Sequence, residues 1–369
     1  MNDIIYLRGL RYVNHTVFCV EKTQKTYWDN YFKRTVPYSS GQQVKRCIIE
    51  SVLGQLKLQR SPLFFGFEVD GEGKKNLKED VVLSYCDPRH VDLLLAGWLN
   101  TNRKSKIQID EANPGADILN YFQTLKRTSP LSISAMLPIH PYAASITAEQ
   151  ISVDRRSDAD DQFIFITDED ENVVNCKKPY DFLDEFAPSQ FHTTKYIEAD
   201  KNLRVTGMFR YDVAIDLRTL FTVSLSPIER SITEKTEAAL RADGWLEHQN
   251  QFGPCLLCPD KKRNEIIPAL AYSLINWQIT SNQSRTFGLP TYIAFAITDQ
   301  AWEIPEMIRT ELSEQDSRQG VSIILDEAFK DKLFVTRGAK AFIDTDLSQP
   351  DAIKKAEQRL IQIFSEYNY

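Results

Sequence analysis

Residues 203–218 read LRVTGMFRYDVAIDLR, and polar and apolar side chains alternate along this stretch. One face would carry Leu203, Val205, Gly207, Phe209, Tyr211, Val213, Ile215 and Leu217. The other face would carry Arg204, Thr206, Met208, Arg210, Asp212, Ala214, Asp216 and Arg218. Because successive side chains of a strand point to opposite faces of its sheet, the pattern predicts one long β-strand with one buried face.

The rest of the chain predicts helices and strands in a definite order around that strand. Ile4–Lys22 is rich in β-branched and aromatic residues, as in a central strand, and TYIAFAIT at 291–298 predicts another strand. Helices are expected after Ser40, over 231–244, over 265–279 and in the tail 349–369. The order strand, helix, insertion, long strand, helix, strand suits a ferredoxin-like α+β sandwich. Its missing strand would come from the irregular middle of the chain.

Length and composition indicate a chain with a large core and no membrane span. It has 369 residues, of which 42% are hydrophobic. The longest apolar stretch, near Ile266–Trp277, is too short to cross a bilayer, and the N-terminus lacks the parts of a signal peptide. We therefore expect a cytoplasmic protein that contacts no membrane. Only Cys255 and Cys258 form a Cys-x-x-Cys pair, and without a second ligand pair we expect no metal there.

The net charge of −7 hides a basic N-terminal segment. Residues 1–60 hold ten Lys and Arg against four Asp and Glu, and the acidic excess lies beyond residue 150. Because the local field decides where a polyanion docks, the acidic total does not exclude a nucleic-acid partner.

The stretch YSSGQQVKRC at 38–47 predicts a helix start that favours anions. Ser40 is a good N-cap and Gln43 follows three residues later, as in a capping box. Unpaired N–H groups in the first turn and the positive end of the helix would attract a phosphate. Lys45 and Arg46 are expected to point away from the apolar stripe of the helix. The plainer interpretation is a capped helix with a solvated basic face.

Five segments resemble, in order, the backbone subunit of type I CRISPR Cascade-type complexes, a RAMP-type protein of the DevR-like branch. They are YSSGQQVKRCI, HVDLLLAGWLN, KRTSPLSISAMLPIH, GMFRYDVAIDLRTL and QSRTFGLPTYIAFAI. The chain departs from the family where NHTVFCVEKTQKTYWDN lacks the glycine-rich loop after the first strand, and where GWLN replaces a basic end. The departures leave the CRISPR subtype open.

The resemblance implies a modified ferredoxin-like or RRM-like palm whose long insertions form a helical fingers region and a β-hairpin thumb. The palm would comprise residues 1–58 and 202–369, and residues 59–201 would hold the fingers and the thumb. FIFITDEDENVVNC predicts a hairpin, so Phe163–Cys176 is the expected thumb, with Pro138–Val153 as a possible contributor.

The resemblance also implies a non-catalytic subunit that polymerises along the CRISPR guide RNA and presents it for pairing. Its partners would be the guide RNA, further copies of itself, other Cascade-type subunits and a target nucleic acid, DNA rather than RNA; no cofactor is expected. The residues expected to contact RNA are Ser39, Ser40, Gln42, Lys45, Arg46, Lys126, Arg127, Ser284 and Arg285. The competing interpretation is a solvated side chain or, for Arg285, one that bonds the carbonyls ending a helix.

Two other functions stay open at this point. Related type III subunits cut target RNA with an aspartate in the loop after the first strand, and Asp29 lies in that loop. Such a role would need the Asp29 carboxylate beside the scissile phosphate. The last alternative is a ferredoxin-like enzyme or scaffold unrelated to RNA.

Overall fold

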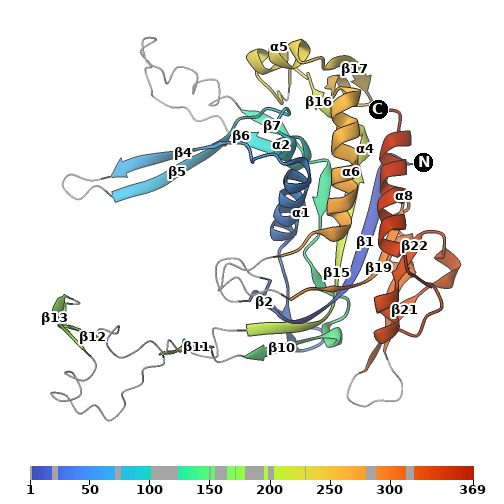
Figure 1. The fold of residues 1–369 in the computed structure, drawn as a ribbon. Coiled ribbons are helices and arrows are strands. Elements are labelled where there is room, and N and C mark those ends of the chain that lie inside the picture. The colour runs from blue at the N-terminus through green and yellow to red at the C-terminus, as the bar shows by residue number, and fades with distance from the viewer. Residues whose placement is uncertain are drawn as a thin grey trace. The chain divides into compact units, whose positions relative to one another are not determined.

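The chain forms two compact units, Met1–Ser145 together with Val205–Tyr369, and Ile146–Arg204. The computed structural model describes residues 2–18, 24–70, 76–100, 124–148, 151–153, 164–170, 172–178, 195–197, 203–228, 230–279, 288–312 and 320–369. The fold is α+β, as predicted, and helices follow groups of strands along the larger unit (Figure 1).

The larger unit is built around strand β1 (Ile4–Thr16). β1 pairs antiparallel with β15 (Leu203–Asp216) on one side and with β19 (Thr291–Thr298) on the other. Leu7 of β1 therefore lies between Val213 and Ile297 in the register of the sheet. The three strands confirm the predicted central strand, long strand and final core strand.

Five shorter strands extend this sheet on both sides. β15 pairs with strands from the middle of the chain, and β19 continues into two strands near the C-terminus. On the side of β15 they are β8 (Leu131–Ile133), β9 (Leu137–Pro138) and β10 (Ala144–Ala148), and on the side of β19 they are β22 (Leu333–Thr336) and β23 (Ser348–Gln349). The irregular middle thus supplies strands to the sheet, as expected.

The alternation in β15 follows the predicted faces. Every second residue from Val205 to Ile215 is buried, whereas Arg210, Asp212 and Ala214 on the other face are half-buried. The buried face packs against the helix that contains Leu274. The Tyr211 hydroxyl donates a hydrogen bond of 2.7 Å to Leu274 O.

Three helices lie side by side in the larger unit: α1 (Gly41–Leu56), α6 (Asp260–Asn276) and α8 (Ala352–Glu366). α6 packs against both α1 and α8, and α8 contacts β19 and β22 (Figure 1). All three were predicted, but α6 begins earlier than expected. Its first turns, DKKRNE, carry no apolar periodicity, so the signal in the sequence starts only at Ile266.

The C-terminal elements form a second core against the same sheet. Leu10 of β1 and Met208 of β15 are buried there with Met307, Ile308 and Val335. The elements of this region are α7 (Glu303–Met307), β20 (Ile308–Leu312), β21 (Val321–Leu325) and the 3₁₀ turns η5 (Glu327–Phe329) and η6 (Arg337–Ala341).

The remaining elements outside residues 59–204 form a hairpin after β1 and a small sheet after β15. They are β2 (Thr26–Asp29), β3 (Arg34–Pro37), α4 (Leu217–Leu220), β16 (Thr222–Ser224), α5 (Glu234–Ala242), β17 (Leu246–Asn250) and β18 (Gly253–Leu257). α5 confirms the predicted helix over 231–244, with Thr233 as its N-cap and Gly244 at a φ of 83° after its end.

Residues 59–145 differ from the predicted helical fingers in the part that the structure describes. This part is mostly strands, and its α-helix, α2, spans only Val91–Ala96. The other elements are β4 (Leu63–Asp70), β5 (Asn76–Ser84), β6 (Trp98–Asn100), β7 (Leu125–Arg127) and the turn η2 (Pro141–Ala143). β4 carries three phenylalanines and a valine and β5 carries two valines, and these residue types favour strands.

The smaller unit contains the predicted hairpin. β12 (Ile164–Thr167) pairs antiparallel with β13 (Val173–Lys177), and the Asp168 carboxylate accepts hydrogen bonds from the backbone N–H groups of Asp170 and Asn172 in the turn. A second pair joins β11 (Ile151–Val153) to β14 (Lys195–Ile197). Phe163, at the start of the expected thumb, lies outside the described residues.

Gly9→Ala should destabilise the larger unit, because a Cβ at Gly9 would lie 2.2 Å from the Tyr211 ring in the core of the sheet. We expect a loss of about 1–3 kcal/mol in the free energy of unfolding, measured by urea denaturation. The matched control is Gly54→Ala in α1, where a Cβ would meet nothing within 4 Å. That change should leave stability unchanged or raise it by up to about 1 kcal/mol. Equal stability of the two variants would contradict this packing.

Candidate nucleic-acid interface

The start of α1 is capped as predicted and keeps unpaired donors. Ser40 is the N-cap, and its Oγ accepts a hydrogen bond of 3.3 Å from the backbone N–H of Gln43. Among the described residues, no hydrogen bond is found for the backbone N–H groups of Gly41 and Gln42. A capped helix with free N–H groups at its positive end can bind a phosphate oxygen.

Side chains of different exposure surround this helix start. Ser39 is buried, exchanges two backbone hydrogen bonds with Met136, and its Oγ has no partner. Gln42 and Arg46 are exposed, and Arg46 forms an ion pair of 3.0 Å with Glu50 one turn later. Gln42 and Arg46 can therefore reach a ligand from solvent, whereas Ser39 belongs to the junction with β9.

Lys45 lies off the apolar stripe of α1, as predicted, but its side chain is half-buried against another segment. Its ammonium donates hydrogen bonds to Ala96 O over 3.1 Å and to Ser129 Oγ over 2.6 Å. Burial, and then the nearby charge of Arg127, lower the pKa of Lys45 to about 8. Helical periodicity places a residue on a face of its helix but does not reveal which other segment covers that face, so these contacts of Lys45 were not predicted.

The end of α2 explains why Lys45 turns inward. The carbonyls that end a helix have no partner within the helix and need other donors. Leu93 O accepts from the N–H of Gly97, Leu94 O from Arg127, Leu95 O from Ser129 Oγ, and Ala96 O from Lys45. Gly97 has a φ of 74°, and a Cβ there would lie 2.4 Å from Arg127 O. Side chains from α1 and from the β7 segment therefore complete the last turn of α2.

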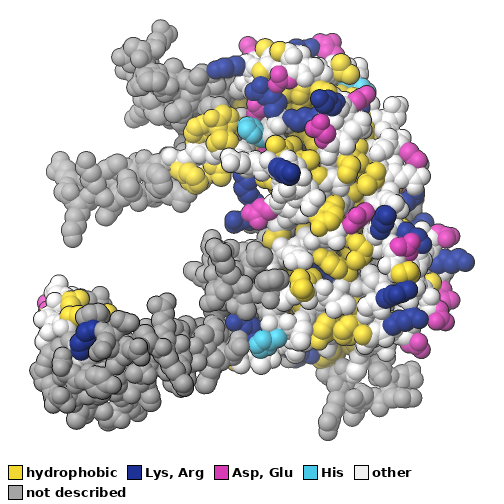
Figure 2. Space-filling model, in the orientation of Figure 1, with side chains coloured by type: hydrophobic (Ala, Val, Ile, Leu, Met, Phe, Trp, Pro, Cys, Tyr) yellow, Lys and Arg dark blue, Asp and Glu magenta, His cyan; other side chains and the backbone are white. Residues whose placement is uncertain are grey.

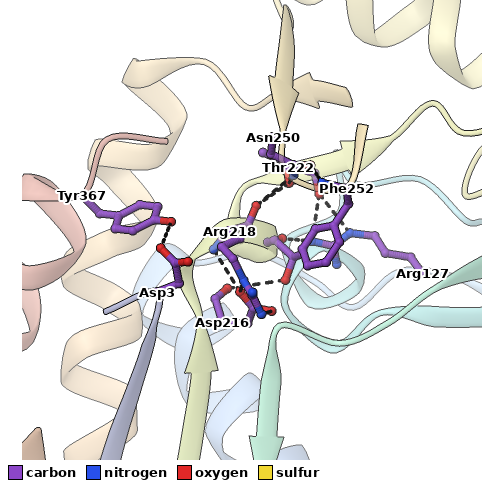
Figure 3. A network of polar contacts seen from close by, with 9 residues as sticks. Asp3, Arg127, Asp216, Arg218, Thr222, Asn250, Phe252 and Tyr367 are labelled. Atoms are coloured by element: carbon purple, nitrogen blue, oxygen red, sulfur yellow. Dashed lines mark hydrogen bonds and ion pairs between the residues drawn. The ribbon is translucent and has the colours of Figure 1, made fainter. Parts of the chain in front are cut away.

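Arg127 is the most deeply enclosed of these donors. Besides Leu94 O, its guanidinium donates to Thr219 O in α4 over 2.8 Å and to Thr222 O in β16 over 3.2 Å. Figure 3 shows Arg127 reaching Thr222 beside the network of Asp216, Arg218 and Asn250. Burial lowers the pKa of Arg127 to about 9. Because its donors are directed at carbonyls, we leave Arg127 out of the proposed RNA contacts.

The other predicted basic contacts differ in position. The Lys126 side chain is exposed beside Arg127 in β7. Ser284 and Arg285 lie outside the described residues, so their expected contacts stay predictions. On the face drawn in Figure 2, basic and acidic side chains are interspersed over the described surface.

Asp29 lies at the end of β2 and holds the turn that follows. Its Oδ1 accepts hydrogen bonds from the backbone N–H groups of Tyr31 over 2.9 Å and Phe32 over 2.8 Å. These bonds give the half-buried Asp29 carboxylate a turn-forming role.

Neither a metal site nor a membrane helix is found in the described part of the chain. No group of three or more His, Cys, Asp and Glu side chains there could hold a metal ion. Cys255 and Cys258 are buried, and burial raises the pKa of both thiols. None of the described helices has the length and apolar character needed to span a bilayer.

Comparisons with known proteins give no family for this chain. No family model and no curated protein matches it. A solved chain titled "CRISPR RNA-guided surveillance complex" aligns over 96% of this chain and 99% of its own length, with 9% identity and a TM-score of 0.39. Another, titled "CRISPR RNA-guided surveillance complex, pre-nicking", aligns over 98% and 89%, with 9% identity and a TM-score of 0.40. Likeness at this level supports no statement about function.

Arg127→Met should lower the stability of the protein, because it leaves the carbonyls of Leu94, Thr219 and Thr222 without their charged donor. We expect a loss of about 3 kcal/mol or more in the free energy of unfolding, measured by urea denaturation. Arg46→Met removes an exposed arginine from the neighbouring helix and should change stability by no more than about 0.5 kcal/mol. If Arg127→Met were as stable as Arg46→Met, the role of Arg127 in capping α2 would be wrong.

Proposed function

We propose that this chain is a non-catalytic RNA-binding subunit that assembles in several copies along the guide RNA of an RNA-guided interference complex. One observation carries the proposal: four of the five segments that resemble the family contact one another at the end of α2. Lys45 joins the α1 segment to α2 and to the segment of Ser129. Arg127 joins the same α2 to the continuation of the long strand at Thr219 and Thr222. Four of the five segments therefore depend on one another in space.

A ferredoxin-like palm is the finer part of this proposal. The sheet order β19, β1, β15, β8, with α1 after β1 and α6 between β15 and β19, supports it. All three pairings in this order are antiparallel, as a β-α-β-β-α-β unit requires. Its second strand would come from residues 131–148, which lie within the region first assigned to the insertion.

The proposed RNA contact is the start of α1. The free N–H groups of Gly41 and Gln42, the Ser40 hydroxyl and the exposed side chains of Gln42 and Arg46 would surround one phosphate. Such contacts do not depend on base sequence, which suits a protein that must hold guides of different sequence. Lys126 adds an exposed charge from β7. The sequence resemblance alone supports the proposed partners. These are further copies of the chain, other Cascade-type subunits and a target that is DNA rather than RNA.

The alternative of RNA cleavage by Asp29 receives no support from the local geometry. One carboxylate oxygen is held by two backbone N–H groups, which stabilise the turn after β2. A general base would need that carboxylate directed at a nucleophile. We therefore propose no catalytic role for the chain.

Ser40→Asp should separate anion binding from helix capping. Aspartate caps helices as well as serine does, so α1 should stay intact, but its charge would lie where the phosphate is proposed to bind. We expect RNA affinity to fall about 10-fold or more, measured by fluorescence anisotropy with labelled single-stranded RNA. The salt dependence of binding should also weaken.

Ser40→Asn is the matched control, because asparagine caps the helix without charge. It should bind RNA within about 2-fold of the unchanged protein. Equal RNA affinity of the Asp and Asn variants would show that the start of α1 is only a capped helix and contacts no phosphate.

A further inference from the structure

The hairpin formed by β2 and β3 exposes two large aromatic side chains to solvent. Trp28 is 55% exposed and Tyr31 is 86% exposed, whereas the other described tryptophans apart from Trp302 are buried. Trp28 lies opposite the exposed Thr35 in the register of the hairpin. Exposed apolar side chains that gather on one element mark a candidate contact site.

The hairpin itself is anchored to neighbouring residues, which holds the backbone of these two residues in place. The Phe32 ring packs edge-on against His140 and Tyr142, with centroids 4.6 and 5.4 Å away. Arg34 lies over the Tyr142 ring and donates a hydrogen bond of 3.1 Å to Ala144 O. Phe32 and Arg34 thus anchor the hairpin, and the Tyr31 ring packs edge-on against Phe32, with centroids 4.9 Å apart, while it stays largely exposed.

The charge around the two exposed rings is positive. Lys25 and Lys33 are exposed in the same hairpin. Asp29 is the one acidic residue of the described hairpin segment 24–38, and its Oδ1 already accepts two backbone hydrogen bonds. Exposed aromatic rings and exposed cations on one anchored hairpin match the chemistry of a single nucleic-acid strand, whose bases stack and whose phosphates are negative.

We propose that Trp28 and Tyr31 form a stacking platform for unpaired bases of single-stranded RNA, with Lys25 and Lys33 neutralising its phosphates. The inference rests on the proposed function, since it assigns a second contact to the same ligand. It differs from the α1 contact in depending on bases rather than on phosphates alone. A base lying on either ring would cover apolar surface that the fold leaves exposed.

The test compares two probes, a 20-nucleotide oligouridine RNA and an abasic strand of the same length, by fluorescence anisotropy with the full chain. Unchanged protein should bind the oligouridine more tightly than the abasic strand. Each of Trp28→Ala and Tyr31→Ala should weaken oligouridine binding about 10-fold, and the double variant about 100-fold. Neither change should affect the abasic strand, which offers nothing to stack on. Trp28→Phe should keep most of the affinity.

Trp302→Ala is the matched control, because Trp302 is 63% exposed but lies beside α7. It should bind both probes like the unchanged protein. If the double variant binds oligouridine normally, the platform is wrong while the α1 contact stands. If the double variant loses self-association but keeps RNA affinity, the hairpin is a protein interface and the inference is overturned. If the unchanged protein binds neither probe, the proposed function fails together with the platform.

Discussion

The last turn of α2 is the junction on which the larger unit depends. Its four terminal carbonyls are satisfied by Gly97 and by side chains from two distant segments: Lys45 comes from α1, and Arg127 and Ser129 come from β7 and the residues after it. Arg127 extends the junction to α4 and β16. Because buried carbonyls without donors are costly, removing any of these donors would loosen several elements at once.

The contacts at this junction separate the predicted RNA-binding residues into two groups, those that bond the protein itself and those that can contact a ligand. Lys45 and Arg127 donate to protein carbonyls, and burial lowers the pKa of each. Gln42 and Arg46 are exposed in the first two turns of α1, and Ser40 is half-buried at its N-cap. The interface that we propose is therefore smaller and less charged than a count of lysines and arginines implies, and it relies on backbone N–H groups that any guide RNA could contact.

Features encoded locally could be predicted from the sequence, and long-range contacts could not. The period of two in β15 and the Ser40 cap of α1 depend on neighbouring residues, and both are present. The inward turn of Lys45 depends on α2, about fifty residues away in the chain, so no local pattern revealed it. The exposure of Trp28 could not be predicted either. It depends on how the hairpin is anchored, through contacts of Phe32 and Arg34 with residues more than a hundred positions away.

The most direct test of the central claim is the mass and nucleic-acid content of the purified particle. The chain would be co-expressed with a guide RNA and candidate partner subunits, and purified particles would be measured by multi-angle light scattering with absorbance at 260 and 280 nm. The proposed function predicts a particle of several copies that carries a small RNA. A monomer free of nucleic acid under these conditions would contradict it.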